Sequence, residues 1–160
     1  PGSLVVDGTL IPTWNWQSLG IINFSCKHKC AGFNHQIICT LDGKFLAITD
    51  PVRGARYDVY AYRFHQLEIF LDEYALADKG YIGSGLLIPT KRKALVSESR
   101  AAVKENKSRV NRLRSVVERV IAQVKTWRVL HTGFRYPLSS YGMVFLVARA
   151  LIFFAAGYPL

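Results

Sequence analysis

The sequence predicts a single α/β domain in which three antiparallel strands come first and helices flank a mixed sheet. Short β-branched runs dominate the first third of the chain, and apolar residues at helical spacing dominate the last third. With 160 residues, half of them apolar, the chain can bury the core of one domain, and its length does not require two.

The predicted strands come from two local patterns. Residues 3–9 are a short apolar, β-branched run that is typical of a central strand, with Asp7 near its end. Residues 35–41 and 44–49 flank Asp42-Gly43, a dipeptide that favours the tight primed turn of a β-hairpin. These two segments should therefore be antiparallel neighbours.

Helices are predicted in the middle and at the end of the chain. Residues 58–71 have helical spacing of apolar side chains, and residues 74–77 return to an extended apolar pattern. Residues 107–126 predict a long helix, on which one broad arc should face the core. The apolar members of this arc are Leu113, Val116, Val117, Val120, Ile121 and Val124.

The segment 140–160 is apolar enough to raise the question of a membrane span. Arg149 lies at its centre, and an arginine there would cost roughly 2.5 to 3.5 kcal/mol on insertion scales. We therefore expect a helix that closes the core, and no membrane partner.

The charge of the chain indicates a polyanionic partner. There are 21 Lys and Arg against 11 Asp and Glu, a net charge of +10. Such an excess favours salt-sensitive, largely sequence-independent binding to nucleic acid.

The beginning of the chain and its cysteines bear on the context of the domain. The chain opens Pro1-Gly2-Ser3 without an initiator Met, so we expect an upstream portion to be missing. It shows no secretory signal pattern, and three Cys suit a reducing compartment, so a cytoplasmic, nucleoid-associated protein is expected.

A zinc site is a weaker alternative for these cysteines. Cys26, His28 and Cys30 alternate along a predicted strand and could hold zinc together with His35 or Cys39. The spacing lacks the usual C-x2-C pairs, so half-buried strand residues are the preferred interpretation.

Three acidic residues lie within apolar stretches of this basic chain: Asp7, Asp78 and Glu118. Burying a carboxylate costs several kcal/mol unless it gains a partner, and a divalent cation is a partner that three converging carboxylates can share. The pattern therefore indicates a catalytic metal site.

Glu118 belongs to a polar stripe on the long predicted helix. Asn111, Arg114, Glu118 and Lys125 lie within roughly 60° of one another at the edge of the apolar arc, where they can look into a cleft. Taken alone, Arg114 and Glu118 could equally be an exposed i,i+4 salt bridge.

Together these residues resemble a known family. Asp7 in a first strand, Asp78 in Ala-Asp-Lys-Gly-Tyr, and Asn111-x2-Arg114-x3-Glu118-x6-Lys125 resemble the DDE-type transposases of bacterial insertion sequences. The resemblance is closest to the group with the Tyr-x2-Arg-x3-Glu-x6-Lys signature and its Harbinger-like relatives. It implies that residues 1–160 are a catalytic domain with a ribonuclease H-like fold.

The resemblance also implies roles for individual residues. Asp7, Asp78 and Glu118 would be the catalytic triad and bind two Mg²⁺ or Mn²⁺ ions. Asp58 would be a possible fourth ligand, although it could instead be the N-cap of the following helix. Arg114 and Lys125 would contact DNA phosphates, assisted by Asn111 and by Lys91, Arg92 and Lys93 of a basic loop, whose charge could also simply be solvated.

Departures from the family pattern leave the triad intact. Asn111 replaces the signature Tyr, Tyr57 stands where His often precedes Asp58, and Arg53 stands where Pro is common. None of these changes removes a member of the triad.

The resemblance implies metal-dependent hydrolysis at a transposon end, which releases a 3′-hydroxyl that then attacks target DNA. Double-stranded DNA would be the partner, and a homodimer on DNA is expected. Two alternatives stay open: an inactive DNA-binding remnant of a transposase, and a ribonuclease H-like nuclease, against which the spacing of Arg114, Glu118 and Lys125 argues.

Overall fold

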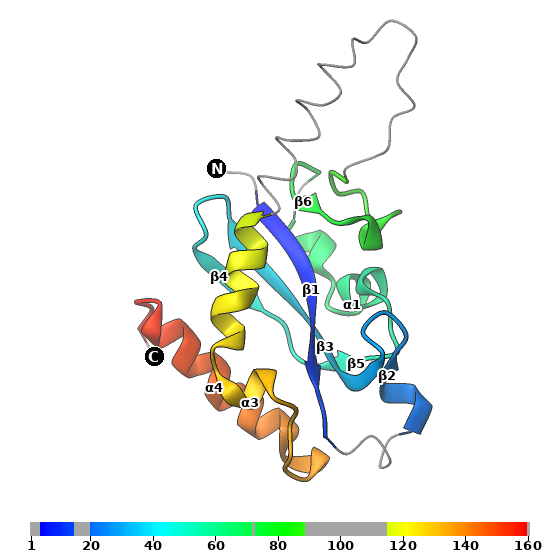
Figure 1. Cartoon of the computed structure of the whole chain (residues 1–160). Helices are drawn as coiled ribbons and strands as arrows, with labels where there is room; N and C mark the ends of the chain where they lie inside the picture. The colour runs from blue at the N-terminus through cyan, green and yellow to red at the C-terminus, as the bar shows by residue number, and fades with distance from the viewer. Residues whose placement is uncertain (1–3, 15–19, 72, 89–114, 160) are drawn as a thin grey trace, which may run out of the picture.

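The computed structural model describes residues 4–14, 20–71, 73–88 and 115–159. Within these residues, six strands form one sheet with the order β2-β3-β1-β6, and β4 and β5 also pair with β3 (Figure 1). The strands are β1 (Leu4–Pro12), β2 (Phe24–Ser25), β3 (Cys30–Thr40), β4 (Phe45–Ile48), β5 (Val52–Arg53) and β6 (Leu76–Ala77).

The predicted antiparallel start of the sheet is confirmed. β1 pairs with β3 and β3 pairs with β4, in both cases antiparallel. Between β3 and β4, Gly43 has a φ of 88°, which is the left-handed geometry that glycine adopts readily. β1 runs three residues beyond the predicted strand, so Asp7 lies in its middle and not near its end.

β6 makes the sheet mixed, as predicted. It pairs with β1 in parallel, with Val5 opposite Leu76 and Val6 opposite Ala77. This parallel pair places the residues that follow Val6 and Ala77 side by side.

The first predicted helix is shorter than the pattern indicated. α1 spans Asp58–Phe64, and a separate 3₁₀ helix, η2, spans Leu67–Ile69. The helix is interrupted between these two segments because Gln66 adopts a left-handed conformation with φ 51°, which an α-helix cannot accommodate. The apolar spacing continued across this break and concealed it.

The remaining helices follow β6. The described part of the long predicted helix is residues 115–125, and its earlier residues lie outside the described ranges. The other short segments and the closing helix are η1 (Gly20–Asn23), η3 (Lys79–Tyr81), α3 (Arg128–His131), η4 (Leu138–Ser140) and α4 (Tyr141–Ala155).

Two apolar cores lie on opposite faces of the sheet. Val5 faces the larger core, which the helix 115–125 and α4 cover, whereas Val6 faces the smaller core beneath α1 (Figure 1). The predicted apolar arc of the long helix is confirmed for its described members: Val116, Val117, Val120 and Val124 are buried, and Ile121 packs against them.

α4 is the predicted closing helix. The segment Leu138–Ala155 has a mean hydropathy of 1.8 and enough length to cross a membrane. It nevertheless packs Tyr141, Phe145 and Ile152 into the larger core. Arg149 donates hydrogen bonds to the carbonyl oxygen of Ile48 (3.0 Å) and to Asp50 (2.8 Å), which ties this helix to the end of β4.

Candidate active site

Asp7 and Asp78 are brought together by the parallel pairing of β1 and β6. Each follows a residue of the pair Val6 and Ala77, so the two aspartates occupy adjacent positions at the end of this short ladder. The backbone N–H of Gly8 donates to Asp7 Oδ1 at 2.8 Å. Asp78 caps η3 by accepting a hydrogen bond from the N–H of Lys79.

Asp58 reaches the same region from the first residue of α1. Its side chain is buried, with Oδ1 accepting from Asn34 Nδ2 at 2.9 Å and Oδ2 accepting from Lys27 Nζ at 3.0 Å. The N-cap of α1 is Tyr57, and no side chain caps this helix. The alternative interpretation of Asp58 as an N-cap is therefore wrong.

Two glycines, Gly8 next to Asp7 and Gly80 two residues after Asp78, allow Asp58 to pack closely against the backbone. A Cβ atom on Gly8 would lie 2.2 Å from Asp58 Oδ1, and one on Gly80 would lie 3.1 Å from Asp58 Oδ2. A side chain at Gly8 would thus overlap the carboxylate, whereas the bare backbone of β1 lets it pack closely. We refer to Asp7, Asp58 and Asp78 as the acid cluster.

The charges of the acid cluster and of Lys27 shift one another's pKa values. The pKa of Asp7 is raised from its usual 3.8 to about 6, mainly by burial and also by the charges of Asp58 and Asp78, against the lowering effects of the Gly8 N–H and Lys27. Burial lowers the pKa of Lys27, but its hydrogen bond to Asp58 and the charges of Asp58, Asp7 and Asp78 outweigh burial and raise it. Like charges held this close disfavour the ionised state and favour a bound cation.

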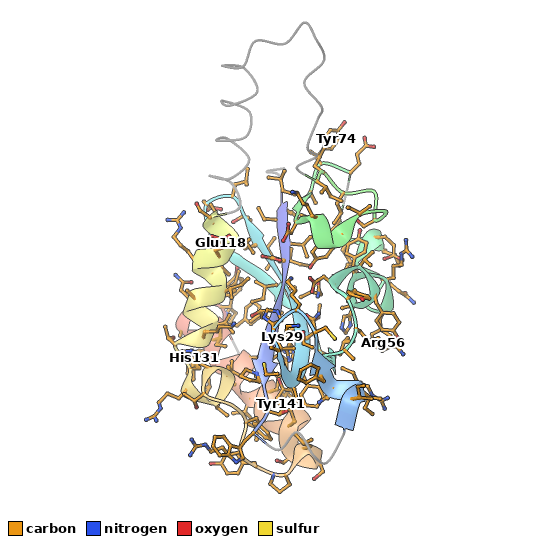
Figure 2. The ribbon with its side chains drawn as sticks, turned by 45° about the vertical axis from the view of Figure 1, so that its right-hand side comes forward. Lys29, Arg56, Tyr74, Glu118, His131 and Tyr141 are labelled. Atoms are coloured by element: carbon orange, nitrogen blue, oxygen red, sulfur yellow. The ribbon has the colours of Figure 1, made fainter. Side chains whose placement is uncertain are left out.

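Glu118 lies on the helix 115–125, and its side chain is exposed. Strand alternation puts Asp7 on the side of Val5 and Ile11, which is the side that the helix 115–125 covers. Figure 2 shows Glu118 in the upper part of that helix. Within the described ranges, no three acidic, His or Cys side chains are gathered closely enough to hold a metal ion as they stand.

The predicted DNA-binding residues divide into two groups. Lys125 is half-buried, and burial lowers its pKa. Its charge also contributes to lowering the pKa of His28, so it lies near the turn that carries Lys27. Asn111, Arg114, Lys91, Arg92 and Lys93 lie outside the described residues.

The expected strand through the cysteines is wrong. β2 ends at Ser25, and residues 26–29 form a turn before β3 begins at Cys30. Lys29 has a φ of 56°, and its N–H donates to the carbonyl of Ser25 at 2.8 Å. Cys26 and His28 therefore belong to a hairpin turn and do not alternate with Cys30 on one face of a strand.

Sequence reasoning missed a buried polar relay that leads to the acid cluster. Tyr81 donates to Gln36 Oε1, Gln36 Nε2 donates to Asn34 Oδ1 at 3.2 Å, and Asn34 donates to Asp58. Asn34 and Gln36 stand two apart in a largely apolar strand, and this spacing was a usable signal. No sequence pattern singled out Lys27.

A hollow opens beside Asp58 between the β2–β3 turn and the loop before α1. Its lining includes Lys27, His28, Arg56 and Asp58. Lys27 and Arg56 thus contribute two positive charges to the lining of the hollow beside Asp58.

Comparison with known proteins decides the family of this chain. Residues 6–152 match the profile of the family described as DDE superfamily endonuclease. The chain belongs to this family.

The chain is also similar to a curated protein. It is 30% identical over 129 residues to the transposase assigned to insertion sequence element IS112 of Streptomyces albus G. The alignment covers 79% of this chain and 49% of the relative, so the chain spans about half the length of that protein. No solved structure matches this chain.

These findings confirm the predicted resemblance to DDE-type insertion-sequence transposases. The observed mixed sheet with helices on both faces confirms the predicted α/β class, and its ribonuclease H-like character stays a prediction. DDE enzymes in general use divalent metal ions. The acid cluster suits such ions because carboxylates are hard oxygen donors and their charges here raise the pKa of Asp7.

Proposed function

We propose that this DDE endonuclease is a transposase catalytic domain that cleaves DNA phosphodiester bonds at transposon ends and joins the released strands to target DNA. The observation that carries the proposal is the side-by-side placement of Asp7 on β1 and Asp78 directly after the parallel strand β6, with Asp58 packed against the backbone beside them. This is a rigid arrangement of carboxylates within a chain of net charge +10.

Asp7, Asp78 and Glu118 are the proposed triad that holds two Mg²⁺ or Mn²⁺ ions, with Asp58 as a fourth ligand. Such ions, when bound, supply Lewis acidity that activates water and stabilises the leaving oxygen. Since the pKa of Asp7 is about 6, its carboxyl group is mostly ionised at neutral pH and available as a ligand. Glu118 would complete the site from the helix that covers the Asp7 side of the sheet.

The remaining residues of the site hold these ligands and contact DNA. Asn34 fixes one oxygen of Asp58 through a buried hydrogen bond, so this carboxylate keeps its orientation. Lys125, Arg114 and Asn111, together with Lys91, Arg92 and Lys93, are proposed to bind the phosphates of double-stranded DNA at transposon ends and target. We propose that the protein acts as a homodimer on DNA in the cytoplasm, at the nucleoid.

Substitution of single aspartates tests this function. Asp7→Asn and Asp78→Asn should each reduce Mn²⁺-dependent nicking of supercoiled DNA by about a hundredfold or more, because each removes a negatively charged ligand. Retention of DNA at low salt should barely change, since neither residue is expected to contact phosphate.

The exposed carboxylate of Glu68 provides the matched control, and Glu68→Gln should nick DNA like the unmodified protein. Nicking retained in both aspartate variants would refute the proposed site. Salt-sensitive DNA binding without any nicking by the unmodified protein would instead identify an inactive transposase remnant.

A further inference from the structure

Lys27 enters the acid cluster from outside the elements that carry the predicted triad. It lies in the turn between β2 and β3, and its Nζ donates to Asp58 Oδ2 at 3.0 Å. The turn is held by hydrogen bonds from the N–H of Lys29 to the Ser25 carbonyl and from the N–H of His28 to Ser25 Oγ (3.4 Å). The lysine is therefore positioned by local structure.

The ammonium group acts on the whole cluster and not on Asp58 alone. Burial lowers the pKa of Lys27, and its pairing with Asp58 together with the charges of Asp7 and Asp78 outweighs burial and raises it. In return, the charge of Lys27 lowers the pKa of Asp7. The charge of Lys27 thus interacts with all three carboxylates.

Lys27 is free to leave this position, whereas Asp58 is not. The Lys27 side chain is 57% exposed, against 11% for Asp58. Asp58 is held by Asn34 on its other oxygen and is packed against Gly8 and Gly80. Departure of the lysine would therefore leave the carboxylate in place.

We propose that Lys27 is a built-in counter-cation of the acid cluster, which a divalent metal ion displaces and which then binds a DNA phosphate. This inference rests on the proposed function. Lys27 would be repelled by a metal ion held by these carboxylates, and a phosphate near the hollow beside Asp58 would offer its ammonium group a new anionic partner.

The proposal predicts coupling between metal and DNA. Because DNA draws Lys27 away from the aspartates, DNA should strengthen metal binding, and metal should strengthen DNA binding by the same factor. Removing the charge at Lys27 should abolish most of this coupling and leave metal binding in the absence of DNA tighter.

Calorimetric titration with Mn²⁺, with and without a short DNA duplex, measures both effects. Without DNA, Lys27→Met should bind Mn²⁺ roughly three- to tenfold more tightly than the unmodified protein, because a nearby positive charge is gone. The enhancement by DNA should shrink in this variant. Lys27→Arg keeps the charge and should behave like the unmodified protein.

Lys29→Met is the matched control, because Lys29 is exposed on the same turn and its charge is not among those that shift the pKa of Asp7. It should leave Mn²⁺ affinity unchanged. Circular dichroism of each variant checks that the fold is kept, and Lys27→Gln provides a second neutral side chain if Lys27→Met folds poorly.

The outcomes separate this inference from the proposed function. If the unmodified protein binds Mn²⁺ and Lys27→Met binds it equally well or more weakly, the role of Lys27 alone is overturned. Absence of Mn²⁺ binding in both proteins would overturn the proposed metal site and, with it, the displacement of Lys27. Binding that appears or tightens when Lys27 is neutralised supports the proposal.

Discussion

Two polar regions of the same sheet differ in how their titratable side chains are partnered. His35 on β3 is fully buried, with Nδ1 2.9 Å from the Thr49 carbonyl and Nε2 2.8 Å from the Tyr141 hydroxyl. The carbonyl can only accept, so Nδ1 carries the proton and Nε2 accepts from Tyr141. In the acid cluster, by contrast, three carboxylates lie near one another beside Lys27, whose side chain is 57% exposed.

The difference separates a structural polar group from a functional one. Burial lowers the pKa of His35 to about 4, so its ring stays neutral and both ring nitrogens have partners. Burial raises the pKa of Asp7 to about 6, so at neutral pH the folded protein holds a charge that its surroundings disfavour. Such stored repulsion lowers stability and prepares the site for a cation.

The largest expected effect comes from filling the space that the acid cluster needs. Gly8→Ala puts a Cβ atom 2.2 Å from Asp58 Oδ1 and should reduce the free energy of unfolding by about 3 kcal/mol, because β1 or α1 must shift. Chemical denaturation measures this change. Mn²⁺-dependent nicking should fall with it, even at temperatures where the variant is folded.

Gly142→Ala is the matched control on the other side of the molecule. Nothing lies within 4 Å of a Cβ atom at Gly142, which belongs to the exposed surface of α4. This variant should gain about 0.5 kcal/mol through its higher helix propensity. Equal losses in the two glycine variants would contradict the close approach of Asp58.

Asp7 and His35 should change the free energy of unfolding in opposite directions as the pH rises. The raised pKa of Asp7 means that the folded protein binds more protons, so the free energy of unfolding falls by about 3 kcal/mol as pH rises from 3.8 to about 6. The lowered pKa of His35 means that the unfolded chain binds more protons, so the same quantity rises by about 3 kcal/mol from about pH 4 to 6.5.

Asp7→Asn separates these two contributions in the metal-free protein. Relative to the unmodified protein, the variant should gain about 2 to 3 kcal/mol of stability at neutral pH and little near pH 4, because the charged carboxylate is absent. Urea unfolding in the presence of a chelator at both pH values measures the difference. A variant that is less stable than the unmodified protein at neutral pH would show that the Asp7 charge is well solvated.

The smallest expected effect concerns DNA affinity. Lys125→Ala should weaken DNA binding and make its salt dependence shallower by about one in the logarithmic slope, as expected for the loss of one phosphate contact. Lys44→Ala, at the exposed turn between β3 and β4, is the control and should leave the slope unchanged. An unchanged slope for Lys125→Ala would remove Lys125 from the phosphate contacts.

Local patterns sufficed for the elements whose cause is local. The hairpin around Gly43 follows from a turn dipeptide, and the core side of the helix 115–125 follows from the spacing of its valines. The same reasoning failed at Gln66, where apolar spacing ran on through a left-handed residue, and at residues 26–29, where a turn stands in place of the expected strand.

By itself the sequence determined the α/β class, the sign of the partner's charge and the identity of the acidic residues that resemble the DDE motif. These depend on composition, periodicity and spacing, which are properties of the chain. Only the tertiary structure decided that Asp58 lies against Gly8 and that Asn34 and Lys27 bind its two carboxylate oxygens. It also decided that Glu118 is exposed on the helix 115–125. Those contacts join residues distant in the chain, and strand register and side-chain packing, which no local pattern encodes, bring them together.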